Sequence, residues 1–328
     1  APPPTESTSP RPHLSGRGTG RRGDRIFATG VRFSGLVVIA LVALTGAFLV
    51  WKAAPALLSN EANFLTSRVW QPGGDHPRFG IAALLWTTTL AAVVALVLAV
   101  PVAVAVALFI TQYAPARLAR PLAHLVDLLA AVPSIIFGLW GIRVLGPVLA
   151  GPHSDVRTSL ESWLGWFPLF ERTGVAQGTV FLAAVVLAMM ILPIVTALSR
   201  EVFTQTPRTN IEAAMSLGAT RWETIRLTVL PFGRPGVISA AMLGLGRALG
   251  ETIAVTLILS QPSALEDFKL SVFFGGETFA SKIANNSSEF STPQQTGAYI
   301  AAGLVLFIIT FAVNAVARLV IARSAREV

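Results

Sequence analysis

The chain has 328 residues, of which 53% are hydrophobic and 13% are charged, with a formal net charge of +8 and no cysteine. Soluble domains carry about 25% charged residues, and a mean hydropathy of +0.65 also indicates a chain surrounded by apolar material. The lack of thiols excludes disulfide bonds and thiolate metal sites. No nucleic-acid partner is predicted, because the basic residues flank apolar segments, where anionic membrane lipid explains them better.

Six long apolar segments follow residues 1–30, a Pro-, Ser-, Gly- and Arg-rich stretch that is predicted to be a disordered basic cytoplasmic tail. Apolar runs of about 18 or more residues are long enough to cross a bilayer as helices. The chain is therefore predicted to be an all-α integral membrane protein with six transmembrane helices. In chain order, the predicted spans are Phe33–Trp51, Ile81–Ile110, Pro121–Ala150, Thr173–Ser199, Gly236–Ser260 and Phe290–Ala317.

The predicted organisation divides into four parts. Residues 31–79 hold the first span and an outer loop, residues 80–322 form the transmembrane core with a long inner loop at 200–234, and residues 323–328 form a cytoplasmic tail. The first span is interpreted as a retained helix, although Ala54-Pro55-Ala56 resembles a signal-peptide cleavage site, because its apolar run exceeds the usual length of about 7–15 residues. Prolines at 101, 133 and 193 interrupt three spans, which membrane helices tolerate.

The distribution of positive charge predicts the orientation. With the amino terminus inside, 16 of the 25 Lys and Arg lie on cytoplasmic segments and seven lie on the outer loops 52–79, 151–172 and 261–295. This bias follows the positive-inside rule and places both termini in the cytoplasm. Three tryptophans of the outer loops suit the lipid interface: Trp70, Trp163 and Trp166.

The inner loop carries local signals for two short helices separated by a turn. Thr209 with Glu212, and Thr220 with Glu223, each have the spacing of a capping box. Gly218 lies between them, where a helix is expected to end in a left-handed cap. A rigid helix displayed in this way predicts a docking element for another protein.

The fifth predicted span carries Arg247 and Glu251 near its middle, where a charge costs about 2.5–3.5 kcal/mol unless it is paired or hydrated. Four residues apart, the two are expected to share a helix face and to neutralise each other in part. Small residues share that face (Ala240, Gly244 and Ala254), while bulkier ones lie opposite (Met242, Leu245, Leu249 and Ile253).

The charged face of this span is therefore expected to look toward a cavity or a partner subunit. Arg247 would attract an anion, since its planar fork matches phosphate-like oxygens, and Glu251 would hold the guanidinium. A buried ion pair that only fixes helix register is the alternative. Asp127 and Arg143 are expected on one helix, roughly 24 Å apart and unable to pair, and they are not assigned to the site.

The inner loop resembles a known family. Its EAA sequence at Glu212, Ala213 and Ala214, followed by Gly218 and Leu230-Pro231, is similar to the EAA loop of ABC importer permeases, with Thr228 at a position that is usually isoleucine. Three more stretches resemble the PstC-type permease subunits of phosphate-specific ABC importers: AAVPSIIFGLWGIRVLGP (130–147), MILPIVTALSREVF (190–203) and GLGRALGETIAV (244–255). The resemblance runs from about Gly80 onward and includes the preceding anchor helix. Arg143 departs from it, since an apolar residue is expected at that position.

This resemblance implies a type I ABC importer permease fold in a bacterial cytoplasmic membrane, spanning it several times. It implies a non-catalytic subunit that moves inorganic phosphate by alternating access, with Arg247 and Glu251 on the substrate pathway and Glu212, Ala213, Ala214 and Gly218 coupling to an ATPase. The implied partners are a PstA-like second permease, a PstB-like ATPase dimer and a PstS-like extracytoplasmic phosphate-binding protein. ATP and Mg would be bound by the ATPase, since this chain has no G-x-x-x-x-G-K-[ST] loop, and no cofactor, metal or catalytic residue is expected here.

Other functions stay open on the sequence. A stand-alone anion channel or an ion-driven carrier needs no docking loop, and carriers often repeat their spans internally. A permease for another oxyanion such as tungstate, and a non-transporting membrane scaffold or sensor, are further alternatives. Flux through the chain alone would favour a channel or carrier, whereas flux that requires an ATPase and a binding protein would favour the importer.

Overall fold

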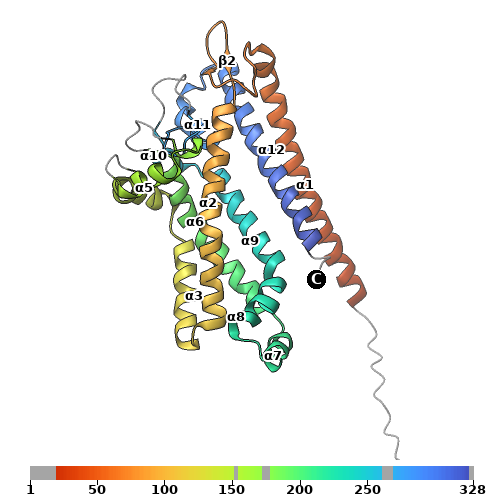
Figure 1. The fold of residues 1–328 in the computed structure, drawn as a ribbon. Coiled ribbons are helices and arrows are strands. Elements are labelled where there is room, and N and C mark those ends of the chain that lie inside the picture. Colours follow the sequence, from red (N-terminus) through yellow and green to blue (C-terminus); the bar gives the residue numbers. More distant parts are fainter. Residues whose placement is uncertain (1–19, 151–153, 172–177, 261–268, 325–328) are drawn as a thin grey trace, which may run out of the picture. The chain divides into compact units, whose positions relative to one another are not determined.

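The computed structural model describes residues 20–150, 154–171, 178–260 and 269–324 (Figure 1). The chain divides into two compact units, Ala1–Phe48 and Leu49–Val328. Helix α1 (Gly20–Ser59) contributes to both. The other α-helices are α2 (Ala82–Leu108), α3 (Ala116–Ala130), α4 (Ser134–Trp140), α5 (Asp155–Leu164), α6 (Val180–Thr204), α7 (Arg208–Ser216), α8 (Arg221–Thr224), α9 (Leu230–Gly250), α10 (Ile253–Ile258), α11 (Phe279–Asn285) and α12 (Pro293–Ser324).

Shorter elements connect or extend these helices. Two strands, β1 (Trp70–Gln71) and β2 (Arg78–Phe79), form an antiparallel hairpin with Trp70 opposite Phe79. The remaining segments are π-helical or 3₁₀: η1 (Phe109–Tyr113), η2 (Gly141–Ala150), η3 (Pro168–Phe170), η4 (Ile225–Val229) and η5 (Ser287–Glu289). Within the second unit, α7 and α8 lie at the opposite end of the helices from the hairpin (Figure 1). We call these the loop end and the hairpin end.

Five described helical stretches are long and apolar enough to cross a membrane: Gly23–Ser59, Ala82–Tyr113, Val180–Thr204, Arg221–Gly250 and Pro293–Leu319. A sixth span exists only if Ala116–Ala130 and Ser134–Leu149, which are bent by 88° at their junction, count as one. The span predicted at Pro121–Ala150 is therefore not one continuous helix, and its interruption at Pro133 is a sharp bend. Pro133 lies at the break, and proline both lacks an N–H and disfavours the helical conformation in the residue before it.

The boundaries of three other predicted elements also need correction. Helix α1 begins at Gly20, so residues 20–30 are helical and do not form a disordered tail, while residues 1–19 lie outside the described part. Helix α6 begins at Val180, after the non-helical Gly178 and Thr179, and the predicted start at Thr173 lies outside the described residues. The predicted span Gly236–Ser260 is interrupted, since α9 ends at Gly250 and a separate helix follows.

Helices α2 and α6 make the most extensive contact in the structure. Every fourth residue of α2 along this contact is an alanine at most 1% exposed: Ala91, Ala95, Ala99, Ala103 and Ala107. Bulky residues on other sides of α2, such as Val97 at 65%, are exposed. Lipid tails are as apolar as valine, so close van der Waals contact between small residues, more than apolar burial, holds such helices together.

The connection after α10 closes the hairpin end of the bundle. The N–H of Val180 donates to the carbonyl oxygen of Phe274 (2.9 Å) and that of Phe181 to the carbonyl oxygen of Val272 (2.7 Å). These bonds satisfy two of the N–H groups that the start of a helix leaves without partners. The N–H of Phe279 donates to Thr88 Oγ1 (3.1 Å), so the connection is fixed to both α2 and α6.

Two glycines of α9 provide a matched test of close helix packing. A Cβ added at Gly236 would clash with the side chain of Val202 on α6, whereas one added at Gly246 would meet nothing within 4 Å. Gly236→Ala is expected to destabilise the chain by about 1–3 kcal/mol through overpacking, and Gly246→Ala should have no such cost. Thermal unfolding in detergent measures both, and equal effects would contradict this packing.

Candidate functional site

The turn between α7 and α8 has the geometry that the sequence predicts. Gly218 has a φ of +87°, its N–H donates to the carbonyl oxygen of Met215 (2.9 Å), and the N–H of Ala219 donates to that of Ala214 (3.2 Å). This pair of bonds is a Schellman motif, which requires a left-handed residue that glycine adopts without steric cost. The predicted glycine cap is confirmed.

The helix after the turn starts as predicted, but the helix before it does not. Thr220 and Glu223 form a capping box, with Thr220 N donating to Glu223 Oε2 (2.8 Å) and Glu223 N to Thr220 Oγ1 (3.3 Å). The predicted box of Thr209 and Glu212 is wrong. Helix α7 begins at Arg208, two residues before the start that a Thr209 cap implies, with Pro207 as its N-cap and no side-chain cap bond. Proline fixes the backbone angle there, so the helix starts without help from the threonine.

Because Glu212 forms no capping bond, its carboxylate lies on the surface of α7. Its side chain and that of Ala213 are exposed, and Ala214 is half-buried. Within the described residues the Glu212 carboxylate has no hydrogen bond or ion pair. Ile211, on the other side of α7, packs against a cluster of Ala107, Leu108, Phe203, Ile225 and Val229 from α2, α6 and η4. The helix is thus anchored on the bundle while its EAA residues face outward.

The charged pair of the fifth predicted span is separated by a break in the helix. Glu251 follows the last residue of α9 with extended backbone angles (φ −68°, ψ 123°). Its Oε1 accepts a hydrogen bond from the N–H of Ala254 (3.3 Å), and the Thr252 hydroxyl donates to the carbonyl oxygen of Gly250 (3.2 Å). Glu251 therefore caps the start of α10, and the expected neutralisation of Arg247 by Glu251 is not formed.

Arg247 lies in the last turn of α9 and is exposed. In the part of the chain that the structure describes, its guanidinium has neither a hydrogen bond nor an ion pair. A Cβ added at Gly246 or Gly250 would meet nothing within 4 Å, so bare backbone flanks the arginine on both sides. A cation with unused donors beside accessible backbone can receive an anion or a partner chain.

The predicted assignment of faces on this helix is partly wrong. Ala240 is 1% exposed, and Gly244 approaches α6, where an added Cβ would lie 3.1 Å from Val195 Cγ2. These small residues therefore face a neighbouring helix of the same chain. Leu249, predicted on the opposite, bulkier face, is 3% exposed and packs in the main core. Arg247 itself is exposed.

The structure also gives the positions of two charged residues that were not assigned to the site. Asp127 of α3 pairs with Arg200 of α6 at 3.5 Å, with side chains 48% and 22% exposed. Arg143 is exposed on η2. They lie on separate helices, because the chain bends between α3 and α4, so the expectation that they share one helix is wrong.

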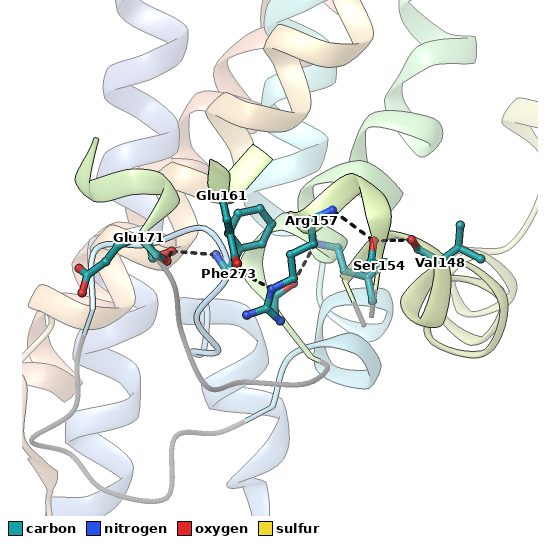
Figure 2. Close-up of polar contacts among 9 residues, drawn as sticks. Val148, Ser154, Arg157, Glu161, Glu171 and Phe273 are labelled. Carbon is teal, nitrogen blue, oxygen red and sulfur yellow. Dashed lines mark hydrogen bonds and ion pairs between the residues drawn. The ribbon is translucent and has the colours of Figure 1, made fainter. Parts of the chain in front are cut away.

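A buried ion pair at the hairpin end was not predicted from the sequence. Arg157 Nε donates to Glu161 Oε1 (2.7 Å), with side chains only 7% and 10% exposed. Figure 2 shows this pair beside Phe273, whose ring lies 5.4 Å from the Arg157 guanidinium carbon. The N–H of Arg157 also donates to Ser154 Oγ at the start of α5 (3.2 Å). The four-residue spacing of opposite charges was the available signal, but it does not reveal burial.

The tryptophans of the hairpin end divide into two groups. Trp163 and Trp166 are 84% and 82% exposed, in agreement with the prediction of an interfacial position. Trp70 is instead half-buried, with its ring 5.7 Å from that of Phe79 and 5.4 Å from that of Tyr299. It helps to pack the hairpin onto α12, so its predicted role at the lipid interface is not supported.

Comparison with known proteins identifies the family. Residues 99–326 match the family described as "Binding-protein-dependent transport system inner membrane component". This chain belongs to that family. Similar family members include the "Phosphate transport system permease protein PstC 2" of Mycobacterium tuberculosis and of Mycobacterium bovis, each 53% identical over 302 residues, or 91% of either chain. The PstC of Mycobacterium leprae is 54% identical over 94% of this chain and 96% of its own. The predicted resemblance is confirmed.

Solved structures of other ABC transporters support the fold. The MetNI methionine ABC transporter in an inward-facing conformation aligns with a TM-score of 0.52 at 15% identity, over 74% of this chain and 96% of that one. A bacterial ABC transporter for alginate import aligns with a TM-score of 0.50 at 17% identity, over 89% and 98%. At these identities the likeness concerns the fold alone, which is that of an ABC importer permease.

The left-handed turn at Gly218 can be tested in the purified chain. Gly218→Val is expected to cost roughly 1–2 kcal/mol, because valine is strained in the left-handed conformation. A steric clash adds nothing to this cost, since an added Cβ there meets no atom within 4 Å. Amide hydrogen exchange in α7 should then accelerate roughly 5- to 30-fold. Gly218→Asn is the control, because asparagine tolerates this conformation. Unchanged exchange in Gly218→Val would contradict the role of the turn.

A double-mutant cycle tests whether Arg247 and Glu251 interact. Because Glu251 caps α10 and does not bond Arg247, the effects of Arg247→Ala and Glu251→Ala on thermal unfolding should add, with a coupling energy below about 0.5 kcal/mol. Glu251→Gln should retain much of the cap and destabilise less than Glu251→Ala. A coupling energy above about 1 kcal/mol would show that the two side chains interact directly, as the sequence predicts.

Proposed function

We propose that this chain is the transmembrane permease subunit of an ATP-driven importer that moves inorganic phosphate across a bacterial cytoplasmic membrane. The observation that carries this proposal is the 53–54% identity, over more than nine tenths of the chain, to permeases of phosphate transport systems. Relatives at lower identity, such as the PstC of Mesorhizobium japonicum at 35% over 92% of the chain, bear the same description.

The α7–α8 loop is the element through which an external ATPase would drive the permease. Its EAA residues face outward, and Ile211 joins it to α2, α6 and η4. A force applied to α7 therefore reaches the packed helices directly, because close-packed interiors transmit strain. Glu212, Ala213, Ala214 and Gly218 would form the contact, with Glu212 offering an unpaired carboxylate to a basic group of the ATPase.

Arg247 is the residue that would meet the substrate on its path. Its guanidinium is exposed and without a partner in the described residues, and a planar cation of this kind binds phosphate oxygens through paired hydrogen bonds. Glu251 would act through the backbone, since it holds the start of α10 immediately after the helix break. The substrate path would thus run along the end of α9, at a surface completed by a second, PstA-like permease.

The remaining parts of the proposal concern orientation, partners and energy. The positive-inside bias favours both termini and the loop end in the cytoplasm, with the hairpin end outside. A PstB-like ATPase dimer would then bind ATP and Mg at the loop end, and a PstS-like binding protein would deliver phosphate at the hairpin end. This chain would contribute no catalytic residue and no cofactor site.

Uptake by the assembled importer in proteoliposomes tests this function. Phosphate uptake should require ATP, the ATPase and the binding protein, and the chain alone should pass no phosphate. Arg247→Ala should lower uptake roughly 10- to 100-fold, the equivalent of a charge-assisted hydrogen bond of about 1.5–3 kcal/mol, while the complex still assembles. Arg143→Ala, at an equally exposed arginine of an apolar segment, is the control and should transport normally.

Three results would overturn parts of the proposal. Phosphate flux through the chain alone would indicate a channel or an ion-driven carrier. Preferential uptake of tungstate over phosphate would change the substrate and keep the importer. Normal uptake in an assembled Arg247→Ala complex would remove this arginine from the pathway.

A further inference from the structure

A cavity of about 740 Å³ lies at the hairpin end, between the last turns of α1 and the first turns of α12. All the residues that line it belong to the second unit. The two helices touch directly below the cavity, where a Cβ added at Gly297 would lie 2.7 Å from Ala56 Cβ. Ala53, Ala56 and Ala298 are buried by this contact, at 0%, 1% and 0% exposure. The cavity is therefore held by a close helix contact.

Its lining combines an apolar wall with polar groups. Trp51, Pro55, Phe290 and Ile300 provide the wall. On the polar side, Gln294 Nε2 donates to Ser59 Oγ (3.0 Å). Thr292 and Thr296 also line the cavity, with hydroxyl groups that donate to Gln295 Oε1 (3.2 Å) and to the carbonyl oxygen of Thr292 (2.9 Å). A ligand that fits both surfaces has an apolar part and a polar head.

The charge of the lining specifies an anionic head. Lys52 is the one charged residue among the residues that line the cavity. Its ammonium lies 5.3 Å from the centre of the Trp51 ring, and no carboxylate pairs with it in the described part of the chain. The N-terminal turn of the 32-residue helix α12 also faces the cavity, and its dipole adds to the positive potential.

The depth of the cavity corresponds to the boundary between lipid and water. The uncharged run from Phe33 to Trp51 ends at Lys52, and α12 begins with the polar sequence Pro293–Thr296 before its apolar run continues. Tryptophan and lysine concentrate at this boundary because each has an apolar body and a polar tip. Phospholipid phosphates lie at the same level.

We propose that this cavity binds one phospholipid, with its phosphodiester at Lys52 and an acyl chain along Trp51, Pro55 and Ile300. A free phosphate ion would use the lysine but would leave the apolar wall exposed, so the lipid fits both surfaces better. The site is separate from Arg247 and from the α7–α8 loop, and it does not depend on the proposed transport function. The bound lipid would fill the space beside the Ala56–Gly297 contact and strengthen it.

Native mass spectrometry of the full chain in detergent, titrated with phosphatidylglycerol, tests this site. The unsubstituted chain should retain one tightly bound lipid. Lys52→Gln should weaken its binding about fivefold, the contribution of one basic residue near anionic lipid, and Lys52→Arg should preserve it. Lys269→Gln is the control, since Lys269 lies outside the cavity, with a side chain 41% exposed and an ion pair to Glu171 (3.4 Å), and it should bind like the unsubstituted chain.

The same experiment separates the lipid from other occupants. Inorganic phosphate at equal concentration should give no adduct that depends on Lys52, and binding of phosphate as tight as that of lipid would overturn the proposal. Equal losses in Lys52→Gln and Lys269→Gln would show unspecific attraction of lipid to charge and would also overturn it. Equal binding of phosphatidylglycerol by Lys52→Gln and by the unsubstituted chain would overturn it as well. Because Lys52 is exposed, the unfolding temperature of Lys52→Gln without added lipid should be unchanged, which excludes misfolding as the cause of a loss.

Discussion

Backbone groups inside a membrane protein must find hydrogen-bond partners within the protein, since hydrocarbon offers none. This constraint makes the interruption after α9 costly unless nearby side chains stabilise it. Thr252 and Glu251 do so, one by donating to the Gly250 carbonyl and the other by accepting from the Ala254 N–H. The Glu251 carboxylate thus bonds a backbone N–H and not Arg247, so the Arg247 guanidinium keeps unused donors at the end of α9. The proposed anion contact depends on this division of roles.

Close packing between small residues decides which surface Arg247 presents. Alanines on α2 and Gly244 on α9 bring their helices against α6, where Val195 and Ile191 fill the remaining space. With those faces occupied, Arg247 remains exposed. The second permease and the anion that we propose for this surface would each desolvate it and strengthen the contacts of the other.

The two ends of the bundle are built by different means. At the loop end, a left-handed glycine and a capping box shape a short exposed helix that a small apolar cluster anchors to the bundle. At the hairpin end, a buried Arg157–Glu161 pair and backbone bonds from the connection after α10 to the start of α6 fix the loops. Breaking one partner of such a buried pair is far more costly than losing a surface pair. These contacts hold the described segments of the hairpin end together.

The sequence by itself determined the features that depend on composition and on short-range geometry. Long apolar runs gave the membrane helices, and the spacing of Gly218, Thr220 and Glu223 gave the turn and the second cap, because those bonds form within a few residues. Tertiary structure decided the rest. Whether Pro121–Ala150 runs straight, whether Glu251 bonds Arg247 or the backbone, and which face of α9 meets α6 depend on neighbours distant in the chain. Periodicity along one helix does not encode those neighbours, since small residues serve a cavity and a close contact equally well.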